Sequence, residues 1–434
     1  MDTFFEGVNV VMQFLLELPA PVLIPIFLVI MAIIMGEKPG RAARSAIIVG
    51  IGFIGIFLLV DLFFAELAPA AEAMVMRWGL NLNIIDVGWG PFMGAIWASP
   101  PALIMLPLFF LLNILLLFVK YTNTLNIDIW NYALCFYAGQ LTYVATGYNL
   151  VLCLVAFVIS VLLTLKIADI TAPAMQKYFN LEGISFPHTV SVAFAPVGWV
   201  LAKVLDKIPG IKDLDADPEV LRKKFGLFGE PTFMGLVIGI IIGIAAGMNF
   251  SGILYLGMAM AGVMFLLPRM VSVLVEGLTP LTGAIRTKLQ KWMPNRSFNI
   301  GLDTAILIGH PTTLAAGIIL VPIALILAAI LPYNRVIPFA DLPSITFAIC
   351  MITPFVRGNV VKLIIIGVFI IAFIMLPVST LVAPEITQVV KDVNMFDVPE
   401  GFGTATEVTS FLDGANPITF VVYKVVSLFG GIGN

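Results

Sequence analysis

The sequence has very little charge. Lysine, arginine, aspartate and glutamate make up 11% of the 434 residues, about half the share in a soluble globular protein, whereas 60% are hydrophobic. The formal net charge is only −3, and no basic block or run of interleaved basic and aromatic residues occurs. These absences exclude a nucleic-acid-binding surface and a soluble globule. The composition therefore indicates a polytopic membrane protein.

Residues that hold metals or form disulfides are also scarce. The chain has three cysteines, each alone in an apolar run, and two histidines. No cysteine pair has disulfide or zinc spacing, and no HExxH, glycine-rich phosphate loop, GxSxG or pair of carboxylates at catalytic spacing occurs. We therefore predict no metal, no cofactor and no catalytic centre belonging to this chain alone.

The N-terminus lacks the positive charge of a signal peptide. Asp2, Glu6 and Glu17 stand where a signal needs lysine or arginine. Apolar residues recur at helical spacing between Phe4 and Leu15, on the face opposite these acids. This pattern predicts an amphipathic helix that lies in the membrane interface.

Long apolar segments come in two series. The segments are 21–36, 45–64, 91–119, 130–146 and 148–166 in the first series, and 231–248, 252–268, 303–331, 343–356 and 359–376 in the second. A charged stretch, 203–230, separates them and is interpreted as a cytoplasmic linker. We therefore divide the chain into a first repeat, 1–202, and a second repeat, 231–434, with about 10 to 11 membrane spans in all.

The two series match at an offset of roughly 211 to 213 residues. Val87–Trp89 corresponds to Ile300–Leu302, and Asp128 corresponds to Asp341, in the same order along the chain. Internal similarity of this kind is typical of transporter folds.

The basic residues predict that the second repeat is inverted. Lys38, Arg41 and Arg44 crowd the loop after the first span, whereas the matching loop at 248–252 has none. The loop after the seventh span is rich in arginine and lysine, whereas its counterpart has only Arg77. Because cytoplasmic loops carry the excess of basic residues, we predict an all-α inverted-repeat transporter whose N-terminus lies outside.

Two stretches are too short and too broken to be ordinary spanning helices. One reads EGISFPHTVSVAFAP at 182–196, and the other begins with DGANPITF and occupies 413–430. Backbone that is not helical survives at membrane depth only where protein buries it or water lines it, because each unsatisfied amide costs several kcal/mol in hydrocarbon. We interpret the two stretches as re-entrant hairpins that line a binding site.

Isolated polar residues in apolar sequence supply the candidate site. The predicted substrate-binding residues are Glu182, His188, Asp303, His310, Asp413, Asn416 and Trp89. Acids and imidazoles can hydrogen-bond to vicinal hydroxyls, and a tryptophan can stack on the apolar face of a sugar or polyol. Two alternatives stay open, since Asp303 could cap a helix and a lone histidine is often structural. Asp128 and Asp341 are interpreted as helix caps rather than ligands.

Short motifs over nearly the whole chain resemble one known family. The motifs are DVGW, LNIDIWN, LEGISFPH, KFGLFGEP, IGLDTAILIGH, RGN and DGANPIT. Together they resemble the sugar-specific IIC permease of the bacterial phosphotransferase system, galactitol type, a relative of the ascorbate permease.

The resemblance implies a homodimer in the bacterial inner membrane, with a scaffold and a mobile core that holds the sugar site. It implies that a periplasmic polyol is carried inward and phosphorylated by a separate IIB subunit, whose phosphocysteine receives phosphate from IIA and ultimately from phosphoenolpyruvate. It also implies one further span with a basic cytoplasmic tail after Asn434.

Two other function classes follow from the residues alone. An ion-coupled secondary transporter of a small polar solute would use broken helices and inverted repeats equally well. An intramembrane enzyme has little support, because no catalytic constellation occurs. Coupling separates the first two classes: a phosphotransferase permease depends on IIA and IIB proteins, and a secondary transporter depends on an ion gradient.

Overall fold

The computed structural model describes residues 20–34, 36–79, 82–212, 216, 230–292, 298–338, 340–395 and 405–432. The predicted amphipathic N-terminal helix and most of the predicted linker lie outside these residues. Within them, five helices are long and apolar enough to cross a membrane: Pro39–Arg77, Leu150–Phe179, Phe250–Leu278, Pro311–Ile330 and Val360–Asp392. The chain is therefore a helical membrane protein, as its composition predicts.

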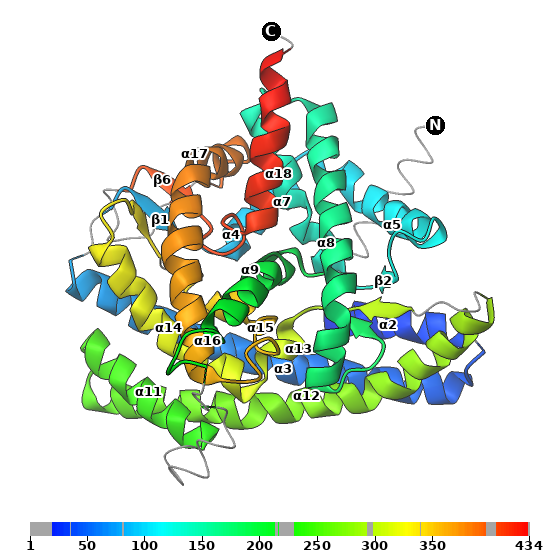
Figure 1. Cartoon of the computed structure of the whole chain (residues 1–434), viewed down its shortest axis with the longest axis horizontal. Helices are drawn as coiled ribbons and strands as arrows, with labels where there is room; N and C mark the ends of the chain where they lie inside the picture. The colour runs from blue at the N-terminus through cyan, green and yellow to red at the C-terminus, as the bar shows by residue number, and fades with distance from the viewer. Residues whose placement is uncertain are drawn as a thin grey trace.

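Four helices form one layer of the molecule, which we call the scaffold. The longest two, α3 (Pro39–Arg77) and α12 (Phe250–Trp292), run across the lower edge of Figure 1 and pack against each other. Helix α2 (Ala20–Ile34) packs on α3, and α11 (Pro231–Ala246) packs on α12. The predicted segments 45–64 and 252–268 lie within α3 and within the first part of α12.

Glycines let the two long helices approach closely. A Cβ atom added to Gly52 would lie 2.6 Å from the Leu274 Cα, and one added to Gly277 would lie 2.7 Å from the Ser45 carbonyl oxygen. The contacts run in opposite directions along the two chains, so α3 and α12 are antiparallel. Close backbone packing of this kind holds helices together in lipid, where burial of apolar surface gives no net driving force.

The other helices form the second layer, the core, which lies above the scaffold in Figure 1. They are α4 (Trp89–Ala98), α5 (Ala102–Phe118), α6 (Ile129–Leu134), α7 (Phe136–Ala145), α8 (Leu150–Phe179), α9 (Thr189–Leu205), α13 (Ala305–Ile308), α14 (Pro311–Ile330), α15 (Ile345–Cys350), α16 (Val360–Ile370), α17 (Leu376–Asp392) and α18 (Pro417–Ser427). A π-helical turn, Ile371–Met375, joins α16 to α17, and a 3₁₀ turn, Leu428–Ile432, follows α18.

Four predicted spans are interrupted, and one of them is 303–331, which is divided at Gly309 and His310 into α13 and α14. Segment 91–119 is two helices, α4 and α5, because two prolines at 100–101 lack the N–H groups that a continuous helix needs. Segment 130–146 is divided at Cys135 into α6 and α7, and only the part of 343–356 that forms α15 is helical. These interruptions bring polar backbone into the centre of the core.

Two small parallel sheets are formed by strands in the loops between helices, although the sequence predicts an all-α fold. One sheet contains β5 (Val336–Ile337), β1 (Ile84–Asp86) and β6 (Glu407–Thr409), in that order. The other contains β2 (Thr124–Asn126), β4 (Asn299–Gly301) and β3 (Ile184–Ser185). Strands of two or three residues are too short to show the alternating pattern by which strands are recognised in a sequence.

The sheets exchange strands between the two halves of the chain. The central strand β1 comes from the first half, and both of its neighbours come from the second. The central strand β4 comes from the second half, and both of its neighbours come from the first. When the strands of each half are counted in chain order, both sheets have the order second, first, third. Each half therefore completes the hydrogen bonding of the other.

Each predicted hairpin region contains a strand, a turn and the start of a helix. In the first region, β3 leads through Phe186 and Pro187 to His188, which caps α9. In the second, β6 leads into the loop 410–416, which we call the β6–α18 loop, and Asn416 caps α18.

The close crossing of α3 and α12 generates a stability prediction. Gly52→Ala is expected to lower the free energy of unfolding by about 1–3 kcal/mol, because the new methyl group meets backbone that cannot move aside cheaply. The matched control is Gly262→Ala, since a Cβ there meets no atom within 4 Å and alanine is the better helix former by up to about 1 kcal/mol. Thermal unfolding of the two purified variants in detergent is the measurement. A melting temperature of Gly52→Ala at or above that of Gly262→Ala would contradict the assigned crossing.

Candidate functional site

A cavity of about 310 Å³ lies between the scaffold and the core. Four residues at helical spacing on α3 form its scaffold wall: Phe57, Val60, Asp61 and Phe64. The opposite wall consists entirely of core residues from both halves of the chain. The cavity therefore has one wall on each layer.

The core wall combines polar and aromatic side chains. Its polar groups include His188, Asp303 and Asp413, and its aromatic groups include Trp89 and Trp130. The two indole rings pack edge to face, with centroids 5.8 Å apart and an interplanar angle of 89°. The wall offers hydrogen-bonding groups beside flat apolar surfaces.

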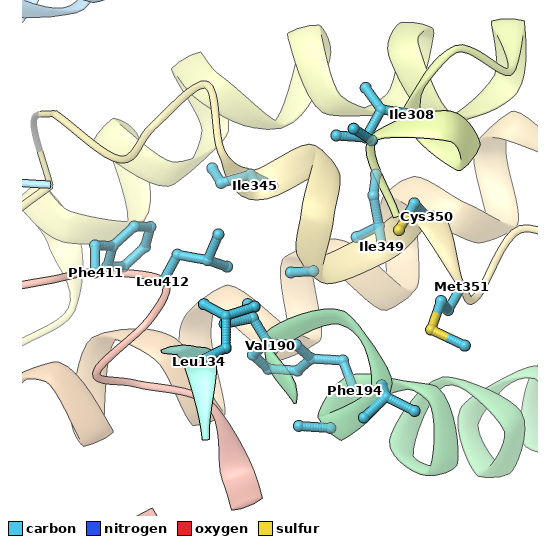
Figure 2. Packing of buried hydrophobic residues seen from close by; sticks show 14 of the residues in the cluster. Leu134, Val190, Phe194, Ile308, Ile345, Ile349, Cys350, Met351, Phe411 and Leu412 are labelled. Atoms are coloured by element: carbon cyan, nitrogen blue, oxygen red, sulfur yellow. The ribbon is translucent and has the colours of Figure 1, made fainter. Parts of the chain in front are cut away.

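Buried apolar packing supports this wall from behind. Figure 2 shows Val190 and Phe194 on α9 and Ile345 and Ile349 on α15, with Leu412 of the β6–α18 loop in the same cluster. All of these side chains are at most 2% exposed. Close packing of this kind limits the side-chain rotations that would misplace the polar groups in front of it.

His188 and Asp303 face each other at the start of two helices. The His188 Nδ1 accepts a hydrogen bond from the Ser191 N–H at 3.3 Å, so in the neutral ring the hydrogen lies on Nε2. The Asp303 Oδ1 accepts from the Ala305 N–H at 2.7 Å, and its Oδ2 lies 3.9 Å from the His188 Nε2. The His188 side chain therefore caps α9, the Asp303 side chain accepts the first N–H of α13, and both residues also line the cavity.

The β6–α18 loop presents Asp413. The Tyr137 hydroxyl donates to the Asp413 Oδ2 at 2.5 Å, and the Asn416 amide donates to the Asp413 carbonyl oxygen at 2.7 Å. Asp413 is 4% exposed. One oxygen of a nearly buried carboxylate is thus fixed by a tyrosine while the residue borders the cavity.

Four of the seven predicted site residues line the cavity: Trp89, His188, Asp303 and Asp413. The other three do not. Glu182 is exposed in the turn before β3. His310 caps α14 through the Thr312 N–H and lies 3.4 Å from the Tyr178 hydroxyl, and fully buried Asn416 caps α18. His310 and Asn416 therefore support helix starts, whereas Glu182 lies at the surface.

Several cavity residues were not predicted, among them Asp61, Trp130 and Phe347. Phe347 stacks on the His188 ring, with centroids 5.3 Å apart and an interplanar angle of 14°. Asp61 carried a signal, because it is the only charged residue in the apolar segment 45–64. Because 45–64 is otherwise a continuous apolar span, Asp61 is not among the predicted site residues.

Two further aspartates hold the core wall together. The Asp341 carboxylate accepts from the Trp89 N–H and from the Ser410 hydroxyl, both at 2.8 Å. The Asp86 carboxylate accepts from the Asp341 N–H at 2.7 Å and from the Phe411 N–H at 3.0 Å. These bonds join the loop before α4 to two loops of the other half of the chain, so they fix Trp89 and the β6–α18 loop relative to each other.

The prediction that Asp128 is a helix cap is confirmed, whereas the Asp341 side chain does not cap the helix that follows it, α15. Asp128 caps its own helix, α6, through the Trp130 N–H. Asp341 instead accepts from the first residue of α4, a helix of the other half of the chain. Residues 341–344 form a turn before α15, so the Asp341 side chain is free of its own helix and reaches across.

The arrangement is suited to binding rather than to metal chemistry. In the part of the chain that the structure describes, no group of three histidine, cysteine, aspartate or glutamate side chains could hold a metal ion. Carboxylates accept hydrogen bonds from hydroxyl groups, the His188 Nε2 can donate one, and the indoles can cover apolar C–H surface. Such a cavity fits a small polyhydroxylated molecule.

Comparison with known proteins gives a family for this chain. The family described as "PTS system sugar-specific permease component" matches residues 14–401. The chain is 38% identical over 376 residues to the "Putative permease IIC component" of Escherichia coli (strain K12), which covers 87% of this chain and 86% of that protein. It is 35% identical over 417 residues to the "PTS system galactitol-specific EIIC component" of the same strain, covering 96% of this chain and 91% of that protein. The family match includes the scaffold and the whole cavity wall apart from the β6–α18 loop.

Proposed function

The chain belongs to the sugar-specific permease components of the phosphotransferase system, and on this basis we propose that its cavity binds galactitol or a related hexitol. It is the membrane-embedded IIC component of such a system. In this family the carried sugar or polyol is delivered to a separate IIB subunit, which phosphorylates it. Membership in the family favours this function over an ion-coupled secondary transporter.

The observation that carries the substrate proposal is the composition of the core wall. A hexitol has a hydroxyl group on every carbon, and His188, Asp303 and Asp413 offer partners for several of them. The C–H surface of the same molecule suits Trp89 and Trp130. The cavity volume of about 310 Å³ lies at the small end of the range for ligand pockets, about 300–1,000 Å³, which fits one sugar-sized molecule. The galactitol-specific relative supports a hexitol.

The carboxylates of the core wall generate a binding prediction. Asp303→Asn and Asp413→Asn are each expected to weaken galactitol binding about tenfold or more, because a hydrogen bond to a charged group contributes about 1.5–3 kcal/mol. Asparagine keeps an oxygen for the Ala305 N–H or the Tyr137 hydroxyl, so folding should be preserved. Calorimetric titration of the purified protein with galactitol is the measurement.

The matched control is Asp392→Asn at the end of α17, which accepts from the Tyr148 hydroxyl and does not line the cavity. Its galactitol affinity should equal that of the wild type. Wild-type affinity in both cavity variants would refute the assigned contacts, and wild-type protein that binds no hexitol would refute the substrate proposal.

We further propose that the two halves of the chain are inverted repeats. The matching strand orders of the two sheets support this relation, because each half contributes one central and two outer strands in the same sequence order. Helix caps support it too. Asn149 caps α8 and Asn359 caps α16, and these helices occupy corresponding places in the two halves. With the basic-residue pattern, the proposal places the start of α3 in the cytoplasm and the start of α12 outside.

Inversion can be tested by the side from which cysteines react. Lys38→Cys, just before α3, should react with an impermeant thiol reagent only from the cytoplasm, and Asn249→Cys, just before α12, only from outside. Both positions are exposed, whereas Cys135, Cys153 and Cys350 are buried, so background labelling should be low. Labelling in intact cells and in inverted vesicles is the measurement. Reaction of both positions from the same side would rule out inversion.

Substrate transport is proposed to proceed by movement of the core as a unit against the scaffold, an elevator mechanism. Hydrogen bonds within the core, such as those from Asp341 to Trp89 and Ser410, would then stay intact during the movement. The scaffold would form the homodimer contact, since it need not move. Helix α3 offers a continuous apolar surface for this contact, with Ile47 63%, Ile51 54% and Leu58 64% exposed.

A disulfide between the layers tests the moving core. A Cβ atom on Gly309 in the core would lie 2.6 Å from the Val271 Cγ2 on α12, which places the two side chains within the span of a disulfide. Oxidised Val271→Cys/Gly309→Cys protein should lose galactitol uptake in cells that supply IIA and IIB, yet keep galactitol binding. Reduction should restore uptake, and each single variant should be unaffected by oxidation. Normal uptake by fully cross-linked protein would exclude the mechanism.

A further inference from the structure

We infer that Asp61 on the scaffold is a substrate contact that operates only while the cavity lies against α3, as it does in this structure, and that it makes this conformation the tighter-binding one. The inference rests on the proposed binding of a hexitol by a moving core. It assigns to the scaffold a part in substrate affinity, in addition to its part as a support.

Asp61 lies in the cavity wall without a partner of its own. It is the only charged residue of α3 between Arg44 and Glu66, and it is exposed to the cavity between Phe57 and Phe64. Within the described residues it makes no hydrogen bond or ion pair. A carboxylate in the middle of an apolar membrane helix is costly and persists where it faces water or a ligand. The cavity provides such an environment for the Asp61 carboxylate.

The carboxylate faces the substrate groups of the core. His188, Asp303 and Asp413 all belong to the core wall of the same cavity. A polyol held there would present hydroxyl groups to both layers, and the Asp61 oxygens can accept hydrogen bonds from those on the scaffold side. During transport the core residues would keep their contacts with the substrate, whereas the contact between the substrate and Asp61 would be broken.

The other half of the scaffold has no carboxylate at the place that corresponds to Asp61. Counted from the first residue of each helix, Ser272 on α12 occupies the place of Asp61 on α3. The Ser272 hydroxyl already donates to the Pro268 carbonyl oxygen at 3.0 Å, and the first acidic residue of α12 is Glu276. A substrate site that has moved away from α3 would therefore lose the Asp61 acceptor and would meet no carboxylate at the corresponding place on α12.

This difference biases the transport cycle. A ligand shifts a conformational equilibrium only as far as its contacts differ between the two states, and Asp61 is such a contact. Substrate would be bound tightly while the cavity lies against α3 and less tightly after the core has moved the site away from Asp61. On the proposed topology α3 ends outside, and Asp61 lies beyond the midpoint of α3, so capture would take place on the outer side.

Galactitol binding by the full chain with the core fixed tests the inference. In protein locked by the Val271–Gly309 disulfide, Asp61→Asn should raise the dissociation constant about tenfold, as expected for loss of a charged hydrogen-bond acceptor. In unlocked protein the same substitution should cost less, because the core can adopt the conformation that does not use Asp61. The matched control is Glu66→Gln on the same helix, outside the cavity wall, which should leave both dissociation constants unchanged.

Three outcomes would overturn the inference or its premise. Locked Asp61→Asn protein that binds galactitol like locked wild type would remove Asp61 from the site. An equal or larger loss in unlocked protein would remove the restriction to one conformation. Locked wild-type protein that binds no galactitol would instead refute the proposed substrate, and this result is visible before any Asp61 variant is compared.

Discussion

Buried backbone that leaves a helix must still find hydrogen-bond partners, and this constraint organises the non-helical parts of the core. The chain meets it with two three-stranded sheets, each built from strands of both halves. Aspartates complete the hydrogen bonding where the strands end, since Asp86 and Asp341 accept main-chain N–H groups from loops of the opposite half. Both halves of the chain therefore contribute strands to each sheet, and neither half could form the sheets alone.

The same constraint explains why polar groups gather at one cavity. Every interruption of a helix creates a helix start with unpaired N–H groups, and a polar side chain is the simplest partner for them. His188 and Asp303 serve this purpose, yet each keeps a second atom directed to the cavity. Capping thus supplies the hydrogen-bonding groups of the site and holds their orientation. The aromatic rings of Trp89, Trp130 and Phe347 surround them with flat apolar surface.

The scaffold and the core are held together by different interactions. The scaffold is held by close backbone packing between α3 and α12, which needs no polar contact with the core. The core is held by hydrogen bonds among its own loops. Because the cavity lies where the layers meet, substrate contacts differ between core residues, which carry the site, and Asp61, which belongs to the scaffold. Substrate affinity and movement of the core therefore both depend on contacts across the boundary between the two layers.

The sequence alone determined the membrane class, the family, the two series of helices, and four cavity residues, because isolated polar residues in apolar runs are costly and stand out. It also determined the capping role of Asp128, since capping depends on residues only two positions apart. Tertiary structure decided the strand exchange, the bond from Asp341 to a distant helix, and the positions of Glu182, His310 and Asn416 outside the cavity. Tertiary structure also placed Asp61 in the wall of the cavity. These features depend on which segments meet in space, and contacts between residues hundreds of positions apart leave no local pattern from which they could be predicted.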